Sequence, residues 1–268
     1  MFEFEHPTPV TVTLRANSGV VALHAEERDT VQVTVEPMDD RDSSAEAADK
    51  TRVVLDGDTL LIEVPHDAKI WRRSAKLAIT ARVPIGSALN GKSASADIQA
   101  AGVWSDVKLD VASADVELAE ATGNVSLDSA SGDLSVGRAG GLVKLDTASG
   151  DVRLNDVTGD AKVKSASGDV FVGTAAGALR ASTASGDVIV GRLSAGQSEI
   201  RTASGDVQAG IAAGAGVWLD LNTASGRTTS DLAPQSETPA TGSTIELRVR
   251  TASGDIHIHR ATTEGKAL

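Results

Sequence analysis

Apolar and polar residues alternate along most of the chain, and the alternation recurs every nine residues. Apolar triplets begin at residues 125, 134, 143, 152, 161, 170, 179 and 188, and they read VSL, LSV, VKL, VRL, AKV, VFV, LRA and VIV. A period of two residues is typical of a β-strand with one buried face. Because a glycine-containing turn precedes each triplet, we predict a repeating strand of about five residues and a turn of about four.

A longer period, twice the first, joins these strands in pairs. Copies of a motif close to ASGDV begin at Ala94, Ala112, Ala130, Ala148, Ala166 and Ala184, and the interval between them is constant at 18. Later copies begin at Ala203, Ala224 and Ala252, after longer intervals of 19, 21 and 28. An internal period of this length indicates a stack of similar structural units.

Two architectures fit this period, an antiparallel meander and a parallel β-solenoid with two strands per coil. A flat meander leaves one face uncovered, whereas a coil closes its Val and Leu rows against the opposite sheet. We therefore predict an all-β fold, a parallel β-solenoid of the β-helix or β-roll kind, with two strands in each 18-residue coil.

The pattern also divides the chain. Residues 1–90 are predicted as an irregular β-rich N-terminal part of the solenoid, in which the polar run from Asp40 to Lys50 is a loop or a short helix. Residues 91–228 form the regular repeat, 229–243 a Ser-, Thr- and Pro-containing surface insertion, 244–260 the last coil and 261–268 a flexible tail.

Composition refines this picture. The chain has three Phe, three Trp and no Tyr, so the core must be thin and lined by Val, Leu, Ile and Ala. The formal charge of −12 argues against nucleic acid and anionic lipid as general partners. Cysteine is absent, so disulfides are excluded. The chain starts MFEFEHPTPVTVTLR, and neither a leader nor an apolar run of about 18 residues is visible, so we expect a cytoplasmic protein without membrane insertion.

One acidic residue recurs in the repeat and is predicted to form a row along one edge of the coils. Its members are Asp97, Asp115, Asp133, Asp151, Asp169, Asp187, Asp206 and Asp255. Stacked carboxylates repel, so we expect backbone N–H groups or Ser hydroxyls to compensate them in Asx-type turns at the coil corners. A cation-binding row is the alternative, but the calcium β-roll spaces its Asp differently from the apolar position. We therefore predict a structural row and no metal site.

The segment GSALNGKS, residues 86–93, matches the phosphate-binding pattern GxxxxGK[ST]. That chemistry requires a helix directly after the loop, because its first N–H groups bind the phosphate. Here the first repeat copy follows instead. We therefore predict no nucleotide site and no cofactor.

Two further clusters are candidates. A possible interaction patch is the only dense basic cluster of the sequence, and it consists of Lys69, Trp71, Arg72, Arg73 and Lys76. His257 and His259 share one face of a predicted strand, but two imidazoles alone rarely form a metal site. The patch could contact an acidic partner or a neighbouring subunit, and a solvated strand end is the simpler interpretation.

The TASGDV repeats, Val83, Pro84 and Gly86 ahead of them, and the late stretches GVWLDLNTASGR and IELRVRTASGDIHI together resemble a known group. The chain is similar over nearly its whole length to the bacterial putative adhesin family of β-strand-repeat domains of unknown function, especially its actinobacterial members. The resemblance implies a β-solenoid and a label of adhesin without a defined ligand.

These observations predict a non-catalytic scaffold or interaction protein. We expect no catalytic residues, because no nucleophile elbow, HExxH motif or Ser, His and Asp grouping is recognisable. The partner is an unidentified protein or polymer. Two alternatives are a self-assembling protein that forms homo-oligomers through its coil ends and a carbohydrate-active β-helix enzyme with paired carboxylates in a groove.

Overall fold

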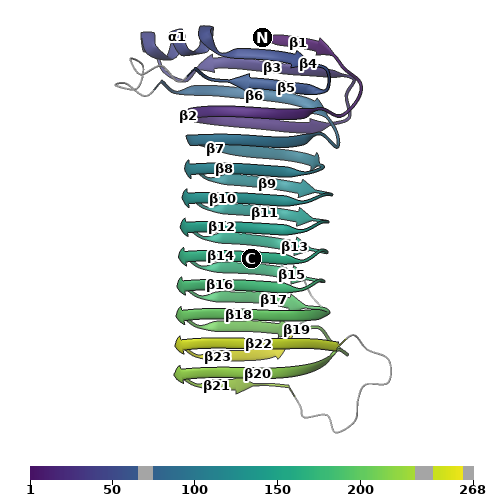
Figure 1. The fold of residues 1–268 in the computed structure, drawn as a ribbon, viewed down its shortest axis with the longest axis vertical. Helices are drawn as coiled ribbons and strands as arrows, with labels where there is room; N and C mark the ends of the chain where they lie inside the picture. The colour runs from purple at the N-terminus through teal and green to yellow at the C-terminus, as the bar shows by residue number, and fades with distance from the viewer. Residues whose placement is uncertain (66–74, 233–243, 262–268) are drawn as a thin grey trace. The chain divides into compact units, whose positions relative to one another are not determined.

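The computed structural model describes residues 1–65, 75–232 and 244–261 (Figure 1). Of these residues, 71% lie in strands and 4% in a helix. Most strand pairs are parallel, so the predicted parallel, solenoid-like all-β fold is confirmed. The chain forms two compact units, Met1–Gly137 and Arg138–Leu268.

The first unit contains one helix and ten complete strands within the described residues. They are β1 (Phe2–Glu5), β2 (Thr11–Glu26), β3 (Thr30–Pro37), α1 (Asp42–Lys50), β4 (Arg52–Asp56), β5 (Thr59–Glu63), β6 (Leu77–Pro84), β7 (Ala88–Trp104), β8 (Val107–Ser113), β9 (Val116–Ala121) and β10 (Val125–Ser131). Strand β11 (Leu134–Ala139) begins in this unit and ends in the next.

Two long strands, β2 and β7, form the first coils of the first unit. They pair in parallel over both halves, Thr11 with Ala88 and Val20 with Asp97, and they turn together at the coil corner. Strands β5 and β6 pair in parallel with the other edge of β2, whereas β8 and β9 pair with β7. Strand β2 therefore lies between segments that follow it in the sequence.

The beginning of the first unit departs from the regular coil. Strands β1 and β3, β3 and β6, and β4 and β5 pair antiparallel, a feature that the repeat pattern did not predict. The polar segment after β3 forms the short helix α1, which buries Ser44 and Ala47 and contacts β3 and β6. Antiparallel strands and a helix thus replace regular coils at this end.

The second unit contains twelve complete strands within the described residues. They are β12 (Val143–Ser149), β13 (Val152–Val157), β14 (Ala161–Ser167), β15 (Val170–Ala175), β16 (Leu179–Ser185), β17 (Val188–Leu193), β18 (Gly196–Ser204), β19 (Val207–Ile211), β20 (Gly216–Ser225), β21 (Thr228–Ser230), β22 (Thr244–Ser253) and β23 (Ile256–Arg260).

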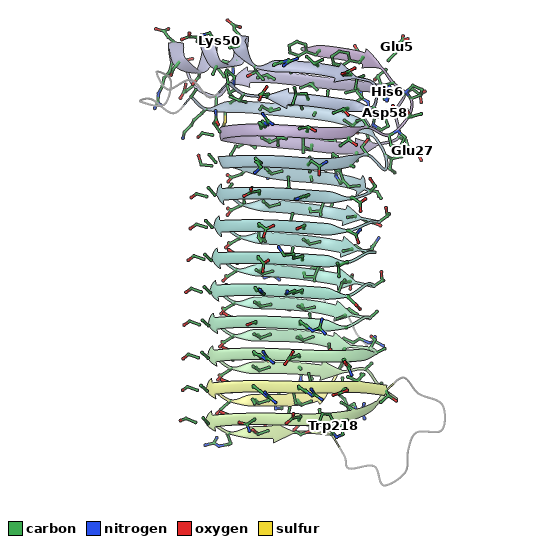
Figure 2. All side chains as sticks on the ribbon, in the orientation of Figure 1. Glu5, His6, Glu27, Lys50, Asp58 and Trp218 are labelled. Carbon is green, nitrogen blue, oxygen red and sulfur yellow. The ribbon has the colours of Figure 1, made fainter. Side chains whose placement is uncertain are left out.

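Corresponding repeat positions lie beside one another in this unit. Val143 pairs in parallel with Ala161 and Ala161 with Leu179, so each residue lies beside its counterpart in the next repeat. Inward positions form buried columns, such as Leu145, Val163, Ala181, Ile200 and Val249, each at most 2% exposed. The predicted thin core of aliphatic side chains is therefore present, and the outward positions project from the sheets (Figure 2).

The order of the coils near the C-terminal end differs from their order in the sequence. Strand β22 pairs with β18 on one edge and with β20 on the other, and β23 lies in the same way between β19 and β21. Residues 244–260, predicted as the last coil, therefore lie between two earlier coils. Over the described residues β20 pairs along one edge only, and self-assembly through coil ends stays a prediction.

Within the described ranges, no helix is long and apolar enough to cross a membrane.

Candidate functional site

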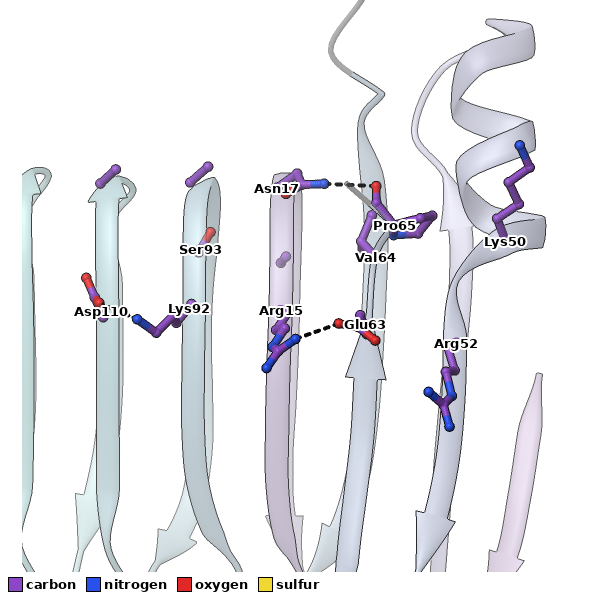
Figure 3. A pocket seen from close by; sticks show the side chains of 13 residues that line it. Arg15, Asn17, Lys50, Arg52, Glu63, Val64, Pro65, Lys92, Ser93 and Asp110 are labelled. Atoms are coloured by element: carbon purple, nitrogen blue, oxygen red, sulfur yellow. Dashed lines mark hydrogen bonds and ion pairs between the residues drawn. The ribbon is translucent and has the colours of Figure 1, made fainter. Parts of the chain in front are cut away.

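The first unit carries a cleft of about 660 Å³ where β2, β5 and β7 lie side by side near the end of α1 (Figure 3). Four basic side chains and two carboxylates line it, with small and apolar residues between them. The lining residues are Arg15, Ala16, Asn17, Lys50, Arg52, Glu63, Val64, Pro65, Lys92, Ser93, Ala94, Asp110 and Ala112. The cleft therefore has an excess of positive charge in a chain of formal charge −12.

Strand register places five of these charges in one row across the sheet. Arg52 pairs with Glu63, Glu63 with Arg15, Arg15 with Lys92, and Lys92 with Asp110. Paired residues of adjacent strands project from the same face, so the five side chains share the outer surface. The two cations in the middle, Arg15 and Lys92, are direct cross-strand neighbours.

Ion pairs hold part of this row in place. Arg15 Nη1 lies 2.7 Å from Glu63 Oε1, and Lys92 Nζ lies 3.0 Å from Asp110 Oδ2. The Arg15 and Lys92 side chains are 64% and 74% exposed, so each pair contributes at most about 1 kcal/mol. These cations can therefore turn toward a bound anion at little cost.

The segment GSALNGKS does not form a phosphate-binding loop. Residues 88–104 form strand β7, and no helix follows Lys92. The Ser93 side chain is 5% exposed, its Oγ donates to the carbonyl of Ala96 at 2.8 Å, and it accepts from the Ala96 N–H at 2.9 Å. The Ser93 hydroxyl is thus hydrogen-bonded within the coil corner. Lys92 is the charged residue of this motif that lines the cleft.

The row of repeat Asp residues is joined by backbone hydrogen bonds. In the first unit, Oδ1 of Asp97 and of Asp115 accepts from the N–H of the next Asp, at 3.1 and 2.9 Å. In the second unit, Oδ1 of Asp151, Asp169, Asp187, Asp206 and Asp255 accepts at 2.8, 2.8, 2.8, 2.7 and 2.7 Å from the equivalent residue of the neighbouring coil. The donor comes from the neighbouring coil, whereas an Asx-type turn uses one of its own.

The opposite corner has a shorter row of the same kind, which the sequence reasoning missed. Oδ1 of Asp106 accepts from the N–H of Asn124 at 2.7 Å, and Oδ1 of Asp160 accepts from the N–H of Ala178 at 2.9 Å. Asp106 and Asp160 follow Asp97 and Asp151 by nine residues, so the half-repeat was the available signal. Both corners thus use the same carboxylate-to-backbone contact.

Chelation of divalent cations is expected to leave the melting temperature unchanged, because the Asp row already receives backbone N–H donors. Circular dichroism melts with EDTA and with added calcium measure this directly. A calcium-dependent rise of several degrees would instead indicate a cation-binding row. Within the described residues, no group of three or more His, Cys, Asp or Glu is placed to hold a metal ion.

The predicted basic interaction patch lies mostly outside the described residues. Of the predicted interaction patch, Lys69, Trp71, Arg72 and Arg73 lie outside the described residues. Lys76 is exposed, and its backbone N–H donates to Ser44 Oγ at 3.2 Å.

His257 and His259 do share one face of β23, where their rings stack with centroids 5.5 Å apart. Burial and the neighbouring His257 lower the pKa of His259, and His257 Nε2 lies 3.5 Å from Asp231 Oδ2. Two imidazoles and one carboxylate make a local polar cluster at the surface of the second unit.

The family model described as Toastrack DUF4097 matches residues 11–258 of the chain. The chain belongs to the Toastrack family. Toastrack DUF4097 is a domain of unknown function, and its solved neighbours include "putative adhesins", as the resemblance implied. The assignment to an actinobacterial type stays a prediction. No curated protein matches this Toastrack chain.

Solved structures resemble the Toastrack chain over most of its length. A "putative adhesin" from Bacteroides fragilis is 13% identical, with 96% of this chain and 95% of that chain covered and a TM-score of 0.44. A "putative lipid binding protein" from Parabacteroides distasonis is 16% identical, with the same coverage and a TM-score of 0.48. A "putative adhesin" from Parabacteroides merdae is 10% identical, with 96% and 94% covered and a TM-score of 0.37.

Proposed function

We infer that this Toastrack protein is a non-catalytic interaction module that holds an anionic group of its partner in the cleft of the first unit. The observation that carries this proposal is the excess of cations in the cleft, four against two carboxylates, in a chain that is acidic overall. Charge of the opposite sign concentrated in a concave site favours an anionic ligand.

The strands position these cations before a ligand arrives. Arg15 and Lys92 stand on β2 and β7, which pair along their whole length, so their separation is fixed by the register of the sheet. Side chains carried by strands are placed more accurately than those carried by loops. The arginines add planar groups that bind carboxylates or phosphates with two parallel hydrogen bonds.

The overall negative charge does not oppose this local attraction. Exposed charges separated by more than about 8 Å are largely screened at physiological ionic strength. A small anion in the cleft therefore senses the adjacent cations much more than the acidic remainder of the molecule. An extended polyanion would contact both the cations of the cleft and the acidic surface around it.

The cleft is poorly suited to glycoside hydrolysis. Its carboxylates, Glu63 and Asp110, stand three strands apart, which corresponds to about 14 Å at the ordinary spacing of paired strands. Glycosidase carboxylates are about 5–9.5 Å apart. Each carboxylate is also engaged by a cation, so binding fits this arrangement better than acid and base catalysis.

Pyrophosphate is a suitable probe of the cleft. In calorimetric titrations at physiological ionic strength, we expect it to bind the wild type and to bind Arg52→Gln/Lys92→Gln at least about fivefold more weakly, because two charge-assisted contacts are lost. Both side chains are exposed, so the substitutions should leave the fold intact.

Lys108→Gln is the matched control, because Lys108 is exposed on β8 and does not line the cleft. The affinity of Lys108→Gln for pyrophosphate should stay within about twofold of the wild type, since an exposed charge outside the cleft interacts only weakly with the ligand. The control removes one charge and the double variant two, so equal losses of binding free energy per charge removed would mean that pyrophosphate senses net charge alone. Such a result, or absence of binding to the wild type, would rule out the cleft as an anion site.

A further inference from the structure

A basic surface lies on the second unit, on the outer face of β14 and β16. We define this basic face by Lys162, Lys164 and Arg180, all of which are exposed. They line a hollow of about 190 Å³ together with Val163, Ala181, Ser182, Glu199 and Arg201. The volume corresponds to about six water molecules, enough for one or two carboxylate groups.

Like charges stand next to one another on this face. Lys144 pairs with Lys162 and Lys162 with Arg180 in adjacent parallel strands. Like charges directly opposite in a sheet are destabilising. The fold of the unit therefore gains no stability from the contacts among these three cations, and an anionic ligand would relieve their repulsion.

The same column provides an internal comparison. Beyond Arg180 it continues through Glu199, Arg248 and Asp220, so the charge sign alternates from strand to strand. Alternating charges across strands are stabilising. The repeat can therefore accept alternation, and the three cations at the start of the column are a local departure from it.

The surrounding cations already have partners, whereas those of the basic face do not. Lys144 Nζ lies 2.8 Å from Asp146 Oδ2, Arg248 Nη2 lies 2.6 Å from Glu246 Oε1, and Arg201 pairs with Glu199. Over the described part of the chain, Lys162, Lys164 and Arg180 make no hydrogen bond or ion pair. Asp146 is the cross-strand neighbour of Lys164 and Glu199 that of Arg180, but these two carboxylates are ion-paired with Lys144 and Arg201. The cations of the basic face can therefore receive carboxylates from outside.

We propose that the basic face binds a short acidic segment of another polypeptide in extended form. Alternate side chains of an extended strand project from one side about 6.8 Å apart. Lys162 and Lys164 are themselves alternate residues of a strand and share this spacing. Acidic residues at every second position of the ligand therefore meet the two lysines, while Arg180 lies one strand away.

A short acidic peptide fits the surroundings better than a larger polyanion. The second unit carries exposed Asp residues along its coil corner, from Asp151 to Asp255. A nucleic acid or an anionic bilayer would extend past the hollow and bring its phosphates near these carboxylates, which costs energy. A few carboxylates confined to the hollow avoid this repulsion.

The test uses a labelled peptide in which Glu and Thr alternate, with fluorescence anisotropy at low salt. We expect Lys162→Gln/Lys164→Gln to weaken binding at least about tenfold, because two charge-assisted contacts are removed. Arg192→Gln/Arg227→Gln removes the same charge from exposed positions of the unit outside the hollow. This control should change the affinity by less than about twofold.

A second peptide of the same composition, with its Glu residues in one block, should bind several-fold more weakly if the strand spacing matters. Equal affinity of the two peptides, equal losses in both double variants, or tighter binding of single-stranded DNA or of anionic vesicles through the same lysines would overturn the proposal. These variants leave the cleft of the first unit unchanged, so the result is independent of the pyrophosphate titration.

Discussion

Gly168→Ala is expected to lower the free energy of unfolding by about 3–5 kcal/mol, a large loss for one methyl group. Gly168 stands at the coil corner after β14 with a φ of +143°, where residues with a side chain are strained. A Cβ added there would lie 2.1 Å from the carbonyl oxygen of Gly150 in the adjacent coil. The backbone of one coil must therefore move away from the other, which also lengthens the hydrogen bond that joins these two coils at the corner, from the Gly150 N–H to Ser167 O, now 3.2 Å.

Gly214→Ala separates backbone strain from steric overlap. Gly214 also has a positive φ, +78°, but nothing lies within 4 Å of an added Cβ. Its loss should be limited to the conformational cost of about 1–2 kcal/mol. Urea denaturation followed by far-ultraviolet circular dichroism measures both variants. If they lose equal stability, close stacking of the coils is not what requires glycine at position 168.

The repeat made the regular part of the fold predictable. Because Ala148, Ala166 and Ala184 recur at one constant interval, equivalent residues had to lie beside one another in parallel strands, and Val143 does pair with Ala161. One buried face per strand then set which residues are inward. These conclusions need only the period and the alternation of apolar residues.

The order of the final coils could not be predicted in this way. The segments GVWLDLNTASGR and IELRVRTASGDI have the same alternation and the same turn, so each fits the position next to β18 equally well. In the structure the later segment, β22, takes that position, and β20 lies beyond it. The order depends on the contacts that each segment makes with the neighbouring coil. The alternation and the turn motif are the same in both segments, so they do not predict which segment lies next to β18.

Of the two candidate sites, the cleft could not be predicted from the sequence, whereas the basic face could have been. The cleft needs Arg15, Glu63 and Lys92 side by side, but the sequence separates β2 from β5 by a helix and two strands, so no period indicates their contact. The sequence does contain a pattern that indicates the basic face, although the predictions made from the sequence did not use it. Residues 144, 162 and 180 are basic and 18 apart, and the repeat alone places them in one column. The net charge of the chain does not indicate this column, because it sums the charges on every face of the protein.

Trp104→Ala in the first unit is expected to cost about 3–5 kcal/mol in unfolding free energy, within the range for deletion of a large buried aromatic side chain. Trp104 ends β7 and is the largest fully buried side chain of the described residues. Its Nε1 donates to the carbonyl of Ala101 at 3.1 Å, so the substitution also removes a part-buried hydrogen bond. The neighbouring strand offers Ala121 opposite it, which is too small to fill the space.

Trp218→Ala is the matched control, because Trp218 is 52% exposed on β20 and has the Arg248 guanidinium 5.7 Å from its ring centroid (Figure 2). An exposed cation–π contact contributes about 0.5–1 kcal/mol, so this variant should lose no more than that. Far-ultraviolet circular dichroism in urea serves both variants, since fluorescence would report the lost indole itself. Trp104→Phe should fall between them, because it keeps most of the ring volume and loses the N–H donor. Comparable stability of Trp104→Ala and the wild type would mean that the core around the end of β7 repacks around the lost ring, contrary to a core of fixed columns.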